Sequence, residues 1–529
     1  MTNRAILLST ISVTLLLEAC ALSASATGGG TGGVGASYDT GGTGGGTEGT
    51  GGSGTGTSST SGAGGSTIAP KTPCTNQQAI RSKIEGASKG DIIKLDACTL
   101  EGPLDVPAGV TIVGLGQGQS WIEAKAGTFG LHVLPGEGKT HLSGLSLTSS
   151  GNAAIVAKGA VDLAIDDVEV VLQRGLGVAI DGATSLSLKN VSVNGGVTPR
   201  SAREFPADVQ PKEAPTHGIV VLNTATVVLD ATTVTGLADY GALFLDSNLT
   251  WTGGSASQTL GTGLFVHGGS AKLESVSLCS AFPGNRKVPA YNGVFEGGAQ
   301  VSSKGLQVCD GFGMGLLHVG ANGVHNDITA TGNHGPAIWV QAADSFELGG
   351  ATNLVEGNRF AGMVFVDVAK VHVSNTKVSN TALATRTLGP AGKGIELGDG
   401  VQLVRSGTDT VFNSVSFTGN AHTGLQVDLG PYDPMSPLVH LTWTSVTAES
   451  TGAAFGAICQ GSPDGTEEIW GPGTYNWDKG ITRSGAAAIN DGLLIDPNDL
   501  VGLIDPNDRP SPTSLLKGEG LASLGVKGL

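Results

Sequence analysis

The stretch TVVLDATTVTGLADYGALFLDS, from Thr226 to Ser247, contains one complete repeat of this chain. It consists of an alternating apolar segment, a polar turn, a second short apolar segment, another turn, and a third segment led by Gly241. Alternation with a period of two is typical of strands that bury one face. The same order of segments recurs in residues 140–160, 161–183 and 185–196, with a period of about 22 residues when insertions are left out.

The repeat continues to Gln460, and three short strands per repeat with one polar turn are typical of coils of a parallel β-solenoid. We therefore predict an all-β fold, a right-handed parallel β-helix of roughly twelve coils over residues 74–460. The segment 75–87 has helical spacing with Ile80 and Ile84 on one face. It is predicted to be a helix that caps the open end of the solenoid, where unpaired strand edges would otherwise be exposed.

Residues 89–116, KGDIIKLDACTLEGPLDVPAGVTIVGLG, add a resemblance to a known fold. They resemble the opening coils of pectate-lyase-like β-helix proteins, in which a Gly-Asp turn starts the first strand. The resemblance extends over residues 74–460 and implies the fold. It does not imply a reaction, because glycines and branched residues specify coils and one fold hosts many functions.

The N-terminal segment predicts export. A basic residue, Arg4, precedes an apolar run that is too short for a membrane span, and LEAC at 17–20 resembles a bacterial lipobox. We predict a lipoprotein-type signal peptide over 1–20, with lipidation of Cys20 and a membrane anchor in the cell envelope, facing the periplasm or the cell surface. The alternative is ordinary signal cleavage within 21–26.

Residues 27–66 contain almost only Gly, Thr and Ser, a composition that cannot bury a core. They are predicted to form a flexible tether. Residues 461–529 are predicted to be a C-terminal extension that contains a duplicated IDPND turn.

Charge narrows the classes of partner. The formal net charge is −16 and the sequence pI is about 5.0. Without a basic patch or an aromatic platform of the nucleic-acid-binding type, nucleic acid is excluded as a partner. An acidic surface also disfavours polyanionic polysaccharides unless calcium bridges them.

Four of the cysteines predict two disulfides in an exported chain, the first between Cys74 and Cys98. Cys279 and Cys309 occupy the same position in consecutive repeats, and stacked coils place such Cα atoms about 5 Å apart, within disulfide range. The alternative for the second pair is two reduced cysteines in a polar column. That column also contains Thr148, Asn194, Thr235, Thr331, Ser379 and Thr418.

Three insertions follow the second strand of their repeats and precede the third: 197–216, 281–292 and 381–393. They should leave the solenoid on one side and form the walls of a groove over the third sheet. The outward column of that sheet is predicted by aligning the strands on their leading glycines. It reads Ala179, Val220, Leu243, Phe265, Phe295, Leu317, Trp339, Val364, Glu396 and Gln426.

An outward stripe of large apolar residues is costly unless it is covered or used. One interpretation makes Leu243, Phe265, Phe295 and Trp339 ligand-binding residues on which sugar rings stack. The alternative is that the insertions, which carry Phe205, Phe282 and Tyr291, fold down and bury the stripe.

Polar residues near this column include several that can exchange protons. The polar residues near it are His217, His267, Glu296, His318, Gln341, Asp367, Glu396, Asp399, His422 and Asp428, and all of them except Gln341 are titratable. Alternation points Glu296 and His318 inward or to the strand edge. Glycoside cleavage needs two carboxyl groups that face each other across the scissile bond. The catalytic candidates are therefore the clustered acids Glu396, Asp399 and Asp428, with Arg386 and Lys393 on the adjoining loop, and His217; solvated turn residues are the alternative.

The resemblance also implies places where catalytic residues of related enzymes would lie. Polygalacturonases carry aspartates at the Gly-led strands, and pectate lyases carry calcium-binding aspartates and an arginine that takes the sugar proton. In this chain the candidate arginines lie on loops; they are Arg200, Arg203, Arg286 and Arg386. Asp166 and Asp167 lie in a different turn from the one that the resemblance implies. Aligned on the glycines, the matching places hold no aspartate; they are His217, Tyr240, Thr262, Asn292, Met314, Ala361, Lys393 and Thr423.

No metal-ligand constellation stands out, and no cofactor is predicted. The duplicated tail carries Asp496, Asn498, Asp499, Asp505, Asn507 and Asp508. Their spacing differs from that of a calcium loop, so Asx-Pro turns compete with a calcium site as the explanation.

Three functional hypotheses remain. The first is a lipid-anchored β-helix protein that recognises carbohydrate or another extracellular surface through the groove. The second is a polysaccharide lyase or glycoside hydrolase, and the third is a structural spacer or adhesin of the envelope.

Overall fold

The computed structural model describes residues 72–196, 216–282, 290–388 and 393–404, together with the shorter pieces 406, 409–421, 424–428, 439–444, 447–449, 473–476, 482–484 and 521. The side chains of 216, 384–397 and 426–428, and those of the strands from 439 to 484, are outside this description. The predicted signal peptide with Cys20, the tether, Cys459 and the duplicated IDPND turns also lie outside the described residues.

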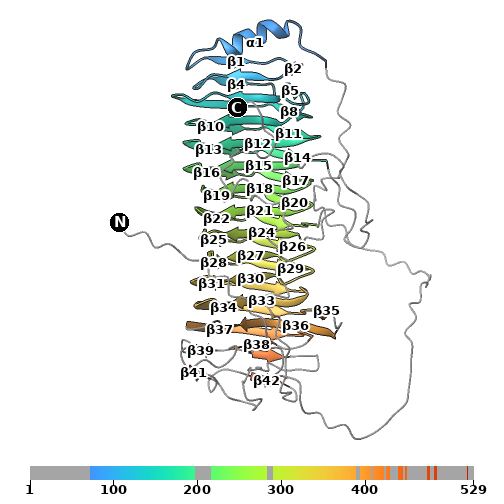
Figure 1. Cartoon of the computed structure of the whole chain (residues 1–529), viewed down its shortest axis with the longest axis vertical. Coiled ribbons are helices and arrows are strands. Elements are labelled where there is room, and N and C mark those ends of the chain that lie inside the picture. Colours follow the sequence, from blue (N-terminus) through green and yellow to red (C-terminus); the bar gives the residue numbers. More distant parts are fainter. Residues whose placement is uncertain are drawn as a thin grey trace, which may run out of the picture. The chain divides into compact units, whose positions relative to one another are not determined.

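The unit Thr72–Leu529 is built from stacked coils. In the repeat Thr226–Ser247, the three segments are β16 (Thr226–Asp230), β17 (Thr233–Thr235) and β18 (Tyr240–Leu245). Each strand pairs in parallel with the corresponding strand of the coil before and the coil after, as the levels in Figure 1 show. The protein therefore has the predicted right-handed parallel β-helix fold.

We name the three walls of the solenoid face A, face B and face C. Face A comprises β1 (Ile92–Lys94), β4 (Thr111–Val113), β7 (Lys139–Ser143), β10 (Asp162–Asp166), β13 (Ser185–Lys189), β16, β19 (Asn248–Thr252), β22 (Ser270–Glu274), β25 (Gln300–Lys304), β28 (Asn322–Asn326), β31 (Ser345–Gly349), the first halves of β34 (Lys370–Ser379) and β37 (Asp409–Thr418), β39 (Val439–Thr444) and β41 (Gly473–Asn476).

Face B continues from face A within each coil. It comprises β2 (Thr99–Glu101), β5 (Trp121–Ala124), β8 (Ser146–Ser149), β11 (Glu169–Leu172), β14 (Ser192–Asn194), β17, β20 (Ser255–Ser257), β23 (Ser277–Cys279), β26 (Gln307–Cys309), β29 (Thr329–Thr331), β32 (Asn353–Glu356), the second halves of β34 and β37, β40 (Thr447–Glu449) and β42 (Thr482–Ser484). Because β34 and β37 run through both walls, faces A and B form one hydrogen-bonded sheet.

Face C is a separate sheet whose strands are all parallel except β35. It comprises β3 (Leu104–Val106), β6 (Phe129–Val133), β9 (Ala153–Lys158), β12 (Gly175–Asp181), β15 (Thr216–Leu222), β18, β21 (Thr262–His267), β24 (Tyr291–Glu296), β27 (Leu316–Val319), β30 (Ile338–Gln341), β33 (Phe360–Val366), β35 (Ala384–Leu388), β36 (Lys393–Val404) and β38 (Leu425–Asp428).

The alternation of the sequence places its apolar residues inside the coils. In the same repeat Leu229, Val234 and Phe244 point inward from the three faces and are buried in one continuous core. The predicted cap is α1 (Gln77–Glu85), whose Ile84 is buried and whose Ile80 packs against the core. The helix therefore shields the first coil, as expected for a solenoid end.

Buried asparagines form a ladder at the corner between faces B and C. The Nδ2 of Asn292 donates to Oδ1 of Asn333 at 3.0 Å, and the Nδ2 of Asn333 donates to Oδ1 of Asn358 at 2.9 Å. The Oδ1 of Asn333 also accepts the backbone N–H of Gly311 at 3.1 Å. The ladder thus satisfies polar groups of a corner that is shut off from water.

Both predicted disulfides are confirmed. Cys74 and Cys98 are bonded across Cα atoms 4.9 Å apart, and Cys279 and Cys309 across Cα atoms 4.5 Å apart. Cys279 and Cys309 are paired neighbours on β23 and β26, in the column expected from the repeat. No helix in the described part of the chain is long and apolar enough to span a membrane.

Candidate functional site

All three insertions leave the solenoid at the corner between faces B and C, as predicted. Residues 197–215 separate β14 from β15, residues 283–289 separate β23 from β24, and β35 with residues 389–392 separates β34 from β36. In the third insertion, β35 pairs antiparallel with the first half of β36, so this part of the chain is a hairpin that extends from face C. The outer side of face C is therefore the candidate site.

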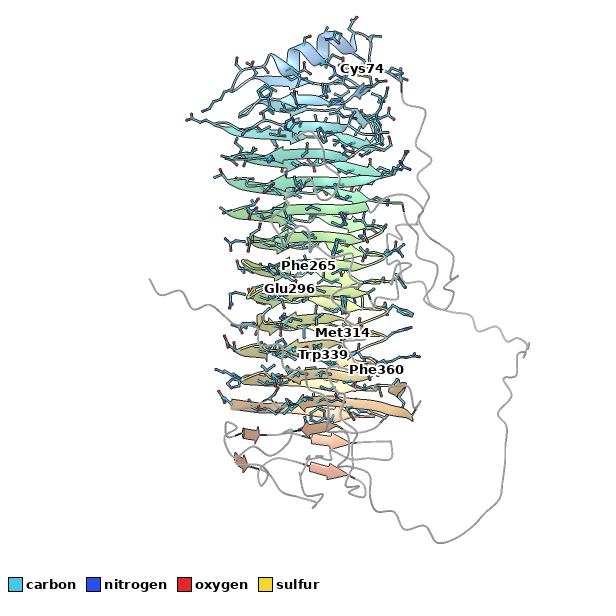
Figure 2. All side chains as sticks on the ribbon, viewed as in Figure 1. Cys74, Phe265, Glu296, Met314, Trp339 and Phe360 are labelled. Carbon is cyan, nitrogen blue, oxygen red and sulfur yellow. A yellow bond between two sulfur atoms is a disulfide. The ribbon has the colours of Figure 1, made fainter. Side chains whose placement is uncertain are left out.

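The register defines a central column of outward residues on face C. From coil to coil it runs Val156, Ala179, Val220, Leu243, Phe265, Val294, Leu317, Trp339, Val364 and Gln402, and the backbone of Gln426 is next in register. Figure 2 shows Phe265 and Trp339 on different levels of this face. Leu243, Phe265 and Trp339 thus occupy the expected column.

Two members of the predicted column are corrected. Phe295 pairs with Val266 and points into the core, because the partner of Phe265 is Val294. Glu396 is replaced in the column by Gln402, which pairs with Val364. Glu396 instead lies in the hairpin and pairs with Thr385.

Both errors have one physical cause. In each case the insertion ends beside a glycine, and the sequence alignment started the strand from that glycine. In YNGVF the leading place is taken by Asn292, one residue before Gly293. In GIELGDGVQLV the hairpin uses the first glycine, Gly394, and the coil resumes at Gly400. For Phe295 the shift is one residue, which exchanges the inner and outer faces of the strand.

The outward stripe is covered. Leu243 and Trp339 are 0% exposed and Phe265 is 1% exposed, and they belong to a second apolar cluster that is separate from the core. Leu521, near the end of the chain, is a member of the same cluster and is 2% exposed. Of the two interpretations left open by the sequence, the structure shows burial of the stripe.

Another outward column of face C lies beside the corner with face B. We name it the first column. By register it contains Leu176, His217, Tyr240, Thr262, Tyr291, Met314, Ala361 and Asp399. Tyr291 and Asp399 therefore stand where the alignment had placed Asn292 and Lys393. The expectation that these places hold no aspartate is wrong, because Asp399 pairs with Ala361.

His217 is buried in this column, one coil after Leu176. Its Nδ1 accepts the backbone N–H of Tyr240 at 3.4 Å, and the two rings lie 5.5 Å apart. Burial lowers the pKa of His217 to about 4. The imidazole is thus neutral near pH 7 and holds the next coil in place.

His267 and Glu296 form a polar pair at the far edge of face C. The Nδ1 of His267 lies 3.2 Å from Oε1 of Glu296. The hydrogen bond to Glu296 and the charges of Glu296 and Asp246 raise the pKa of His267, against the opposing effect of partial burial. Glu296 therefore lies at the strand edge, one of the two positions that alternation allowed.

The remaining polar candidates are dispersed. His318 is inside the core, as alternation allowed, Gln341 ends β30, and Asp367 follows β33 at a turn with positive φ. His422 and the side chains of Glu396 and Asp428 are outside the described residues.

On face C, Trp339 and Gln402 lie in the central column two coils apart with Val364 between them, and Asp399 lies in the first column of the same coil as Gln402. Asp399 is 0% exposed, and the Nε2 of Gln402 donates a hydrogen bond to its Oδ2. Gln402 was missed by the sequence alignment, although the alternation of GVQLV after Gly400 points it outward.

The register keeps Asp399 apart from Glu296 and from the backbone of Asp428. Asp399 on β36 and Glu296 on β24 are four coils apart, about 19 Å at the usual strand spacing. Along the strand direction, Asp399 and the backbone of Asp428 are about 17 Å apart, because Asp428 pairs with Val404. Paired carboxyl groups of glycosidases lie roughly 5–9.5 Å apart. In the described part of the chain, no three His, Cys, Asp or Glu side chains could hold a metal ion.

Fold and site together define a right-handed parallel β-helix protein with a covered aromatic stripe on face C. No family model matches the sequence, and no curated protein matches it. Similar solved structures include the A-module of a mannuronan C-5 epimerase from Azotobacter vinelandii, with 13% identity, a TM-score of 0.39, and coverage of 78% of this chain and 97% of that chain.

Two other similar structures are a periplasmic alginate epimerase and a pectate lyase. The epimerase has 10% identity and a TM-score of 0.34, with 71% of this chain and 89% of that chain covered. The lyase has 11% identity and a TM-score of 0.30, with 63% and 78% covered. The fold of this chain is established by its own strand register.

Proposed function

We propose that this protein recognises carbohydrate through the outer side of face C. The observation that carries the proposal is the concentration of aromatic rings there: Tyr240, Phe265, Tyr291 and Trp339 all belong to the outer cluster, beside the corner where the insertions leave. On faces A and B, by contrast, the same repeat presents threonines such as Thr226 and Thr235.

Aromatic rings suit sugars because a pyranose has an apolar face of C–H groups and an equator of hydroxyl groups. Such a ligand buries its apolar face against rings and is oriented by a few polar groups. Since the stripe is buried together with Leu521, a ligand would have to replace an apolar cover. Exchange of one apolar contact for another costs little free energy of desolvation. The cover competes with the ligand for the stripe and therefore lowers the apparent affinity of the protein for the ligand.

A polysaccharide lyase or glycoside hydrolase is a second candidate, favoured by the position of Asp399 in the first column. The distances from Asp399 to Glu296 and Asp428 do not support paired carboxylate chemistry. Appearance of new reducing or unsaturated ends with time, abolished by D399N, would favour this candidate over recognition alone.

We further infer export to the cell envelope. Two disulfides support it, because disulfides persist in oxidising compartments. Anchoring through Cys20 is part of the proposal and predicts incorporation of labelled palmitate into the expressed chain. The variant C20A should lose that label.

The experiment for recognition is a polysaccharide and glycan array probed with the full chain and with W339A. We expect binding to one glycan class, weakened at least about tenfold by W339A, which corresponds to roughly 1.4 kcal/mol. The matched control is W121A, because Trp121 lies on β5 of face B and the same residue type is removed from another face.

The outcomes separate the hypotheses. Binding that W121A preserves and W339A weakens supports recognition through face C. Equal binding by both variants places the ligand elsewhere, and absence of binding to every glycan favours a structural spacer or adhesin.

A further inference from the structure

The corner between faces B and C carries a column of side chains that belongs to neither sheet. The N–H of His334 donates to the carbonyl of Gly311 at 2.8 Å, and Arg359 pairs in parallel with Ala382. Since the bonds of a parallel ladder are slanted, each reaches the carbonyl one residue before the aligned partner. We name the residues aligned in this way the corner column; they are Phe282, Phe312, His334, Arg359 and Ala382.

The central members of the corner column reach solvent. Phe312 and His334 are half-buried, and Arg359 is exposed. The ring centres of Phe312 and His334 are 5.4 Å apart, with an angle of 37° between the ring planes. These two rings therefore form an accessible platform, in contrast to the aromatic stripe of face C, which is covered.

Arg359 and Asp310 place a donor group and an acceptor group near the two rings. Both side chains are exposed, and neither makes an ion pair or a side-chain hydrogen bond with the described residues. Both act on His334: burial lowers the pKa of its imidazole, the charge of Arg359 adds to the lowering, and the charge of Asp310 opposes it. The imidazole is thus neutral near pH 7 and has one charge of each sign in its vicinity.

The backbone beside Arg359 is held in an uncommon conformation. Phe360 has a φ of 68°, which is rare for a bulky residue, and the N–H of Ala361 donates to the carbonyl of Arg359 at 2.9 Å. The side chain of Phe360 packs against the outer cluster of face C. Such a turn persists only where the surrounding contacts hold it. Neighbouring residues are thereby separated, with Phe360 packed on face C and Arg359 exposed at the corner.

This set of groups matches an uncharged sugar. A pyranose can lay its C–H face on the two rings, while its hydroxyl groups accept from the guanidinium fork of Arg359 and donate to the carboxylate of Asp310. A ligand with a carboxylate or sulfate group would be attracted by Arg359 but repelled by Asp310 and by a chain whose net charge is −16. The balance of charges therefore favours a neutral sugar.

We propose that Asp310, Phe312, His334 and Arg359 form a surface site that binds a neutral sugar at the corner between faces B and C. This inference rests on the proposed function for the class of ligand. It adds a site that a glycan reaches without replacing the cover of face C. Phe312 and His334 supply the platform, Arg359 supplies donors, and Asp310 supplies an acceptor.

The test is isothermal titration of the full chain with neutral and acidic hexasaccharides. The neutral set contains glucose and mannose oligomers, and the acidic set contains galacturonate oligomers and sulfated glucose oligomers. We expect neutral oligomers to bind at least about tenfold more tightly than acidic ones. Their affinity should change less than about twofold when sodium chloride is raised from about 0.1 M to about 1 M, because an uncharged ligand has no ion pair to screen.

Three variants remove the platform, the donor and the repelling charge in turn. F312L keeps an apolar side chain without a ring, and R359Q keeps a polar side chain without the guanidinium fork. Each should weaken the binding of neutral oligomers about fivefold to tenfold. D310N should raise the affinity for acidic oligomers several-fold, because it removes the nearby negative charge.

Matched controls make the result specific. W121L replaces a half-buried ring of face B by leucine, and R174Q removes a guanidinium group from the segment between β11 and β12, at the same corner in an earlier coil. Both should bind neutral oligomers like the parent chain. Circular dichroism and melting curves of every variant exclude loss of folding as the cause of weaker binding.

The results distinguish this inference from the function on which it rests. If W339A abolishes glycan binding while F312L and R359Q bind like the parent chain, recognition through face C stands and the corner site is refuted. Losses in F312L and R359Q that W339A does not share support the corner site and count against face C. Tighter binding of acidic than of neutral oligomers refutes the neutral-sugar site, and absence of binding to every oligomer, with all variants folded, removes both proposals.

Discussion

At the residue scale, the interior of the solenoid contains a pair of neutral histidines. The Nε2 of His325 lies 3.3 Å from the Nε2 of His318, and the Nδ1 of His325 lies 2.7 Å from Oγ of Ser303. Burial lowers the pKa of His325 to about 4, and burial together with the neighbouring His325 lowers the pKa of His318 well below its usual range. The fold therefore keeps both rings uncharged.

This pair should make the fold sensitive to acid. Below pH 6.5 the unfolded chain binds protons that the folded chain does not, so the free energy of unfolding falls as pH drops, until His325 of the folded state also binds a proton near pH 4. Each such histidine contributes roughly 1.4 kcal/mol per pH unit. We expect H325L to lose less stability than the parent chain between pH 7 and pH 5, as measured by guanidinium unfolding.

The control for this prediction is F346L. The ring of Phe346 packs against both histidines, with ring centres 5.3 Å from His325 and 5.6 Å from His318. F346L should lower stability equally at both pH values, because it removes packing without removing a proton site. The same pH dependence in H325L and the parent chain would contradict the assignment.

Two turn glycines allow the steric cost of an added Cβ to be measured separately from the cost of a left-handed backbone. Gly254 and Gly298 have nearly the same positive φ, 82° and 79°. A Cβ at Gly254 would lie 2.0 Å from the carbonyl oxygen of Thr232, whereas a Cβ at Gly298 meets nothing within 4 Å. We expect G298A to cost about 1–2 kcal/mol for the left-handed backbone alone, and G254A to cost on the order of 3–5 kcal/mol. The denaturant midpoints of unfolding of G254A and G298A measure this difference in stability. Equal midpoints would count against the steric argument.

At the element scale, the asparagine ladder holds the corner from which the insertions leave. N333L should remove the acceptor of the Gly311 N–H and one of the two acceptors of Asn292 Nδ2, at a cost of about 2–5 kcal/mol. N326L is the control, since Asn326 lies on the outer side of face A and is only half-buried. Denaturant unfolding should show a large loss for N333L and less than about 1 kcal/mol for N326L. A similar loss in both would mean that the ladder contributes little.

The strands, turns and insertions also show how much of the structure could be predicted from the sequence. Alternation and the glycine before the third strand were sufficient for three strands per coil, the helical spacing of Ile80 and Ile84 for the cap, and the repeat position of Cys279 and Cys309 for the second disulfide. They failed where an insertion met a glycine, because local pattern cannot tell whether Gly394 or Gly400 resumes the coil. Phe295 and Glu396 were misplaced for that reason, while Asp399 and Gln402 were brought together by a register that only pairing with β33 defines.

At the scale of the whole molecule, the burial of face C depends on residues distant in sequence. Leu521 is far along the chain from β38, the last described strand of face C, yet it belongs to the same apolar cluster as Phe265 and Trp339. No period or motif in the sequence connects these positions. The cover could therefore be found only from the folded chain, and it decides whether the aromatic stripe is accessible.

Replacement of Leu521 by aspartate should uncover part of this cluster. A carboxylate placed among buried apolar side chains loses its hydration without gaining a partner, so the replaced side chain should leave the cluster. We expect L521D to increase the fluorescence of an apolar dye several-fold while the far-ultraviolet circular dichroism of the coils is unchanged. The matched control is L383D, because Leu383 is already 47% exposed and should tolerate the charge. Equal dye binding by L521D, L383D and the parent chain would show that Leu521 does not close the stripe, and the face would then have to be covered by other parts of the chain.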